Sequence, residues 1–163
     1  MEMWDAYDTQ MNKIEGVTLV RGEKIPDGVF HLVCDVLVRH IDGSYLIMQR
    51  DFRKYFGGMW EATAGGSAFK GETPLQCAKR ELLEETGIVA SQLEESGRMV
   101  SAEKNRIYVG FLCVTDWKKD EITLQEGETI AYKWVNVDEL LKINAKGQVS
   151  NRTQRLISEL FKL

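Results

Sequence analysis

The sequence has few cysteines, and no two of them lie close together in the sequence. Its 163 residues include three cysteines, Cys34, Cys77 and Cys113, with no C-x-x-C spacing among them. An odd number of widely spaced cysteines favours neither a disulfide framework nor a cysteine-rich metal site. We therefore expect three buried free thiols in a reducing compartment.

Long apolar runs and an excess of basic residues are also absent. No stretch approaches eighteen consecutive apolar residues, and no N-terminal run has the order of a secretory leader, so we expect a cytoplasmic protein that does not span a membrane. The formal net charge of −4 argues against a general nucleic-acid binder. A nucleotide ligand is still compatible with that charge, because a bound metal inverts the local potential.

The length and the element pattern predict one α/β domain over residues 1–163. Residues 1–28 read as an N-terminal extension or hairpin. Valine- and leucine-rich strands alternate with helices after it, which predicts a mixed sheet packed between helices, an α/β sandwich. The expected strands are 30–39, 45–50, 59–64, 97–101, 106–115 and 129–135, and the expected helices are 74–86, 137–143 and 151–163.

The helix at 74–86 carries clear start and stop signals. Thr73 is a favourable N-cap, Pro74 occupies the first helical position, and Gln76 completes a capping box with Thr73. Gly87 stands where a left-handed C-terminal cap is expected. A loop containing two glycines, Gly65 and Gly66, is expected to lead into this helix.

Three glutamates crowd one face of that helix. Glu81, Glu84 and Glu85 fall within an arc of roughly 100° at 100° per residue, where like charges repel. Oxygen-only clusters are what hard divalent cations such as Mg²⁺ prefer. Spacing alone leaves a solvated acidic face and a metal site about equally favoured.

The stretch AGGSAFKGETPLQCAKRELLEETGI resembles the Nudix box, whose pattern is G-x5-E-x7-R-E-U-x-E-E-x-G-U with U aliphatic. The box spans residues 66–88, and every position of the pattern is matched. The matching residues are Gly66, Glu72, Arg80, Glu81, Leu82, Glu84, Glu85, Gly87 and Ile88. The resemblance implies a Nudix-type α/β/α sandwich and a diphosphate (pyrophosphate) hydrolase that uses Mg²⁺ or Mn²⁺.

The resemblance also implies a set of metal ligands on this helix. Glu84 and Glu85 would bind the metal directly, and the carbonyl of Gly65 would often complete its coordination. Glu81 would be a third ligand or the group that activates water. Spacing does not decide which glutamate is the base.

Two further roles follow from the same resemblance. Arg80 would pair with Glu72 and orient the neighbouring carboxylates. Another carboxylate often comes from a segment after the box, and QEGETIAYKW offers Glu126 and Glu128. We prefer Glu128 as this catalytic carboxylate; two solvent-exposed loop glutamates are the alternative.

The wider chain resembles the branch of Nudix proteins related to isopentenyl-diphosphate isomerase. In the isomerases a cysteine acid/base lies in the strand before the box, whereas WEATAGGSAFKGE has none. We therefore predict hydrolysis of a small diphosphate compound, such as a nucleoside diphosphate derivative. The alternatives are an isopentenyl-diphosphate isomerase-like enzyme and a non-catalytic nucleotide-binding domain.

A basic cluster before the box is the candidate substrate contact. Arg50, Arg53 and Lys54 lie close in sequence to the expected site entrance and would bind a distal phosphate, with a solvated loop as the alternative. The aromatic candidates for stacking on a ring are Tyr55, Phe56, Trp60 and Tyr108. The N-terminal segment would pack on its own domain or across the two-fold axis of a homodimer.

Overall fold

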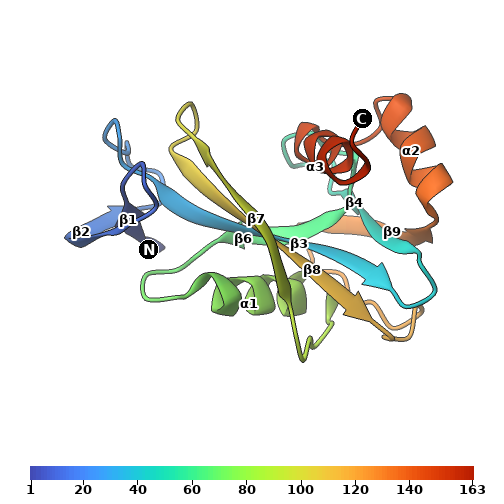
Figure 1. Ribbon diagram of the computed structural model, residues 1–163. Coiled ribbons are helices and arrows are strands. Elements are labelled where there is room, and N and C mark those ends of the chain that lie inside the picture. The colour runs from blue at the N-terminus through green and yellow to red at the C-terminus, as the bar shows by residue number, and fades with distance from the viewer.

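Nine strands and three helices make up the fold in the computed structural model, which describes residues 1–163 (Figure 1). The strands are β1 (Met3–Tyr7), β2 (Lys13–Val20), β3 (His31–His40), β4 (Tyr45–Arg50), β5 (Trp60–Glu61), β6 (Thr63–Ser67), β7 (Glu94–Ser101), β8 (Arg106–Thr115) and β9 (Thr129–Val135). The helices are α1 (Pro74–Thr86), α2 (Val137–Ala145) and α3 (Asn151–Phe161).

The main sheet is built around β3. It has the strand order β5-β4-β3-β8-β7, with β6 also paired to β3 and β9 to β4. β3 and β8 run parallel in unbroken register from His31–Arg106 to His40–Thr115, whereas the other pairs are antiparallel. The predicted mixed sheet is confirmed.

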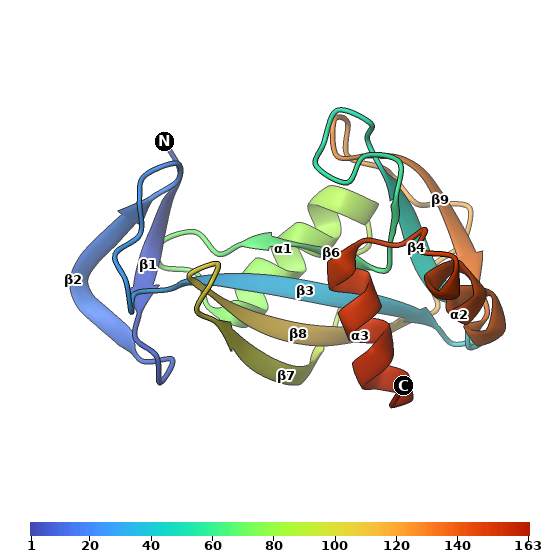
Figure 2. The same ribbon diagram turned by 90° about the horizontal axis from the view of Figure 1, so that it is seen from above.

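Helices cover both faces of this sheet and define two apolar cores. α1 lies on one face, and α2 and α3 lie on the other (Figures 1 and 2). Cys77, Ala78 and Leu82 of α1 belong to the larger core, and Leu140 and Ile157 of the other two helices belong to the second. The predicted α/β/α sandwich is confirmed. None of the helices is both long and apolar enough to cross a bilayer.

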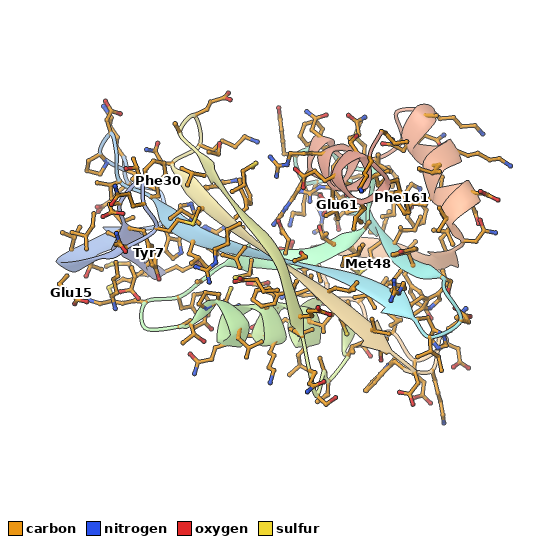
Figure 3. The ribbon with its side chains drawn as sticks, in the orientation of Figure 1. Tyr7, Glu15, Phe30, Met48, Glu61 and Phe161 are labelled. Carbon is orange, nitrogen blue, oxygen red and sulfur yellow. The ribbon has the colours of Figure 1, made fainter.

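The N-terminal strands β1 and β2 form a separate antiparallel pair that packs on its own chain. Tyr7 and Phe30 exchange backbone hydrogen bonds of 2.8 and 2.9 Å, and both lie where the small sheet meets β3 (Figure 3). The Trp4 ring stacks on His31 with 3.9 Å between centroids. The predicted hairpin is therefore anchored to the start of β3.

The segment before the box differs from the expected glycine loop. The predicted strand 59–64 is divided into β5 and β6, and β6 carries both glycines in regular pairing with β3. Gly65 faces Asp35 so closely that a Cβ would overlap the Cys34 carbonyl and lie 2.7 Å from Asp35 Oδ1. Close strand approach, and not loop flexibility, accounts for the glycine. β7 also begins three residues before the predicted strand, at Glu94.

Candidate active site

Helix α1 is held at both ends as its sequence predicts. Gln76 N donates to Thr73 Oγ1 at 3.2 Å and Thr73 N donates to Gln76 Oε1 at 2.9 Å, which forms the capping box. Gly87 adopts φ 77° and its amide donates to Leu83 O at 2.9 Å. These caps fix the length of the helix and the direction in which its glutamates point.

The three glutamates of α1 line one pocket of about 390 Å³. The glycines of β6, Gly65 and Gly66, line the same space. The remaining walls come from the N-terminal pair, the 51–59 loop, β8 and the segment before β9. Those wall residues include Glu2, Trp4, Arg21, Lys54, Arg106, Gln125 and Glu128.

Arg80 binds three carboxylates at the rim of the pocket. Its Nε and Nη2 donate to the two oxygens of Glu72 at 2.6 and 3.0 Å. Its Nη1 donates to Glu81 Oε1 at 2.7 Å and to Glu84 Oε2 at 3.2 Å. The guanidinium carbon lies 3.8 Å from the centre of the Phe69 ring. The predicted Arg80–Glu72 pairing is confirmed.

Gly66 makes room for the side chain of Glu81. A Cβ at position 66 would lie 2.7 Å from Glu81 Cδ, inside contact distance. Glu81 is itself buried, and Arg80 supplies its hydrogen bond. Glycine at this point therefore determines where the Glu81 carboxylate sits.

Burial makes negative charge unfavourable on two of these glutamates. Burial, followed by repulsion from Glu81 and Glu61, raises the pKa of Glu85 to about 8. Burial also raises the pKa of Glu81, although its contact with Arg80 opposes that rise. A cation placed between the carboxylates would relieve both effects.

The available ligand atoms are of the kind that a hard divalent cation prefers, but they are not arranged around a single point at metal-binding distances. All are oxygens: the carboxylates of Glu81, Glu84 and Glu85 and the carbonyl of Gly65. No three acidic, histidine or cysteine side chains stand at metal-binding spacing. The expected convergence of three carboxylates on one spot is therefore incomplete, because Arg80 draws Glu81 and Glu84 toward its own Nη1.

Comparison with known proteins decides the family. The family model described as NUDIX domain matches residues 29–156. The chain belongs to the Nudix family. An uncharacterized Nudix hydrolase of Listeria monocytogenes is 33% identical over 150 residues, which cover 91% of this chain and 88% of that protein. From the family match and this similarity, we conclude that the chain is a Nudix hydrolase.

Other relatives, which are matched over a smaller share of their length, carry different named activities. An NAD-capped RNA hydrolase, NudC of Haemophilus influenzae, is 29% identical over 82% of this chain and 51% of its own length. An isopentenyl-diphosphate Delta-isomerase of Streptomyces coelicolor is 33% identical over 60% of this chain and 57% of its own length. The predicted resemblance to the isomerase branch is thus supported over part of the chain.

The fold of this Nudix domain has a similar counterpart among solved structures. The crystal structure of DR0079 from Deinococcus radiodurans has a TM-score of 0.79 and covers 97% of this chain and 98% of its own. Its sequence identity of 16% limits that comparison to the fold.

The three predicted substrate-binding cations occupy different surroundings. Lys54 lines the pocket of this Nudix domain and is paired with Glu128. Arg50 lies in an adjoining cavity, where its Nη1 binds Glu61 at 2.8 Å. Arg53 lies outside both spaces, because its Nε and Nη2 bind Asp51 at 2.9 and 2.6 Å. The structure brings only Lys54 beside the carboxylates.

No cysteine reaches the pocket. Cys34 and Cys77 are completely buried, and their sulfurs lie 3.3 Å from Pro74 O and 3.6 Å from Gly66 O. A hydrogen bond with Cys77, together with burial, raises the pKa of the Cys34 thiol far above its usual range. All three cysteines are free, as predicted.

Sequence reasoning missed several residues that line the pocket. Glu2, Trp4 and Arg21 reach it from the N-terminal pair, and Arg106 reaches it from β8. Their positions depend on strand pairings between distant segments. Only the predicted hairpin at residues 1–28 hinted that this part of the chain lay nearby.

Proposed function

We propose that this Nudix hydrolase cleaves a diphosphate linkage in a nucleoside diphosphate derivative by attack of water on phosphorus, with Mg²⁺ or Mn²⁺ as cofactor. The observation that carries the proposal is that Glu81, Glu84 and Glu85 of the box line one pocket together with Gly65. The similarity to a relative named as an NAD-capped RNA hydrolase supports a nucleotide-derived substrate.

In this proposal the metal is held by Glu81, Glu84, Glu85 and the Gly65 carbonyl. A divalent cation supplies neutralisation of phosphate oxygens and acidification of water when it is bound. The raised pKa values of Glu81 and Glu85 support the assignment, since these carboxylates gain most from a nearby positive charge.

Arg80 acts as the positioning residue. Its paired contact with Glu72 is rigid and bidentate, so the guanidinium holds Glu81 and Glu84 at a defined separation. Glu81 and Glu84 would have to leave Nη1 in order to hold a metal, and the separate contact of Arg80 with Glu72 would keep the guanidinium in place.

Glu128 is the proposed general base, and Lys54 the proposed contact to a substrate phosphate. Both residues line the pocket and are paired with each other, whereas Glu126, two residues earlier, does not line it. An anionic substrate competes with Glu128 for Lys54, which frees the Glu128 carboxylate to accept a proton from water. Arg50 and Arg53 remain proposed substrate contacts, although neither lines this pocket.

The buried cysteines favour hydrolysis over isomerisation. Protonation at carbon in an isomerase of the cysteine type needs a thiol in the pocket, and neither Cys34 nor Cys77 lines it. The complete set of box carboxylates favours catalysis over passive nucleotide binding.

Hydrolysis in ¹⁸O-labelled water tests the reaction. Mass spectrometry is expected to find the label in one phosphoryl product, which also identifies the phosphorus attacked. Glu128→Gln is expected to lower kcat about a hundredfold, because a general base contributes about 10²- to 10⁴-fold. Glu126→Gln is the matched control and is expected to stay within twofold. Equal activity of the two variants would remove Glu128 as the base.

Cytoplasmic location and a homodimer are kept as proposals. β1 already packs against the start of β3 and pairs with β2, so the N-terminal segment is buried within its own chain. Light scattering after size-exclusion chromatography tests the dimer, and a monomer at micromolar concentration would reject it.

A further inference from the structure

A second cavity adjoins the catalytic pocket and is strongly basic. It has a volume of about 580 Å³, within the range of small-molecule sites. Five cationic side chains line it, Arg50, Lys104, Arg106, Arg152 and Arg155, against one acidic residue, Glu61. On a chain whose formal charge is −4, this is a local reversal of sign.

Arg106 connects the two spaces. It lines both the catalytic pocket and the basic cavity, so the two spaces lie side by side. Glu61, labelled in Figure 3, lines the basic cavity and is paired there with Arg50. The basic cavity is therefore a neighbour of the candidate catalytic site.

Three of the five cations have no carboxylate partner. Lys104, Arg106 and Arg155 make no ion pair, whereas Arg50 is paired with Glu61 and Arg152 with Asp35. Arg155 is held over the Tyr108 ring, with its guanidinium carbon 5.0 Å from the ring centre. Unpaired cations gathered in one cavity gain free energy when an anion enters.

The start of α3 adds donors to this cavity. Figure 2 shows α3 crossing the sheet, and its cap Ser150 and first residue Asn151 line the space. The amides of Asn151 and Arg152 have no backbone acceptor, as at any helix N-terminus. Arg152 also has a solvent-inaccessible Nε that lacks a hydrogen-bond partner, whereas its Nη2 is paired with Asp35. The free donors at the start of α3 favour an anionic ligand in this cavity.

We propose that this cavity binds a second phosphate group of the substrate, outside the diphosphate that is hydrolysed. The inference rests on the proposed function for its assignment to a substrate. A phosphomonoester dianion fits the donors, because it offers three oxygens to the free cations and to the helix terminus. The preferred substrates are therefore diphosphate compounds that carry an additional phosphate on the part farther from the metal.

Binding of inorganic phosphate tests the cavity without any catalysis. Calorimetry is done with chelator present, so that no divalent cation takes part. Wild type is expected to bind one phosphate, and Lys104→Ala and Arg155→Ala each to bind it about tenfold more weakly, which corresponds to about 1.4 kcal/mol. Lys118→Ala removes an exposed lysine that is paired with Glu121 at 3.4 Å, and is expected to bind as wild type does. Equal phosphate binding in all four proteins would overturn the proposal.

A pair of substrates that differ by one phosphate tests the assignment to the substrate. NADH and NADPH serve as the probes, because they share the same diphosphate. Wild type is expected to favour NADPH through a lower KM, and Arg155→Ala to lose that preference while keeping kcat for NADH. Arg155→Lys is expected to recover part of the preference.

The outcomes separate this inference from the proposed function. Hydrolysis of both compounds with equal KM leaves the hydrolase intact and overturns the substrate-phosphate site; phosphate binding in that case assigns the cavity to free phosphate. Absence of all diphosphate hydrolysis rejects the proposed function, whereas phosphate binding sensitive to Arg155 would still show an anion site there.

Discussion

Arg80 and Glu72 form a two-point ion pair, with Nε and Nη2 at 2.6 and 3.0 Å from the two carboxylate oxygens. Both side chains are mostly buried, and the pair joins the start of the box to the middle of α1. Because the remaining nitrogen of Arg80 holds Glu81 and Glu84, this pair sets the geometry of the candidate metal ligands.

Replacing Arg80 by lysine tests that geometry. Arg80→Lys keeps the charge but loses the fork that reaches Glu72 and Glu81 together. We expect the free energy of unfolding to fall by about 1–3 kcal/mol in urea titrations, and kcat to fall more than KM changes. Arg98→Lys is the control: Arg98 also contacts a glutamate, Glu95, but at an exposed position, so a change within about 0.5 kcal/mol is expected. Equal effects of both substitutions would contradict the role.

Two alanine substitutions in β6 separate activity from stability. At Gly66 the new Cβ meets the flexible end of Glu81, so we expect activity to fall about a hundredfold with little loss of stability. At Gly65 the new Cβ meets the Cys34 backbone, so we also expect weaker β3–β6 pairing and a lower thermal midpoint. Circular dichroism and turnover measured on both variants decide between these effects. A folded, fully active Gly66→Ala protein would contradict the close packing of Glu81.

His31 predicts a pH dependence of stability. Burial, followed by repulsion from Arg106, lowers its pKa to about 4, and its Nδ1 has no hydrogen-bond partner. The unfolded chain takes up this proton near pH 6.5 and the folded chain does so only near pH 4. Stability is therefore lost as pH falls from about 6.5 to 4, by an amount on the order of 3 kcal/mol. His31→Phe is expected to flatten this part of the urea-unfolding profile, and an unchanged slope would contradict the assignment.

Divalent cations are expected to stabilise the folded chain. A ligand that binds only the folded state adds about 2.7 kcal/mol at one hundred times its Kd, so Mg²⁺ should raise the thermal midpoint. Glu84→Gln is expected to reduce this rise, whereas Glu94→Gln, which changes a glutamate outside the pocket, keeps it. The same rise in all three proteins would place Mg²⁺ elsewhere.

The box helix was predictable because its signals are local. Thr73, Gln76 and Gly87 act within a few residues of the turns that they cap, and the alignment of Glu81, Glu84 and Glu85 follows from helical periodicity. The α/β sandwich was predictable for the same reason, since its strands and helices are each marked by composition and spacing.

The rest of the site depends on contacts between distant segments. Arg106 reaches the pocket because β8 pairs in parallel with β3, and Arg155 reaches the basic cavity because α3 packs beside Tyr108. The residue periodicity within β8 or α3 does not predict which distant segment each of them contacts. The glycines of β6 were expected in a loop, because their close approach to β3 is likewise visible only once the strands are paired.

The central claim is metal-dependent hydrolysis of a diphosphate, and one substrate panel tests it most directly. Released phosphate is measured, before and after phosphatase treatment, with Mg²⁺ and nucleoside triphosphates, ADP-ribose, dinucleotide polyphosphates, NADH, NADPH, coenzyme A and isopentenyl diphosphate. We expect turnover of at least one nucleoside diphosphate derivative, abolished by chelator and reduced at least a hundredfold in folded Glu84→Gln protein. Turnover that is equal in Glu84→Gln, or conversion of isopentenyl diphosphate to its isomer without phosphate release, would contradict the account.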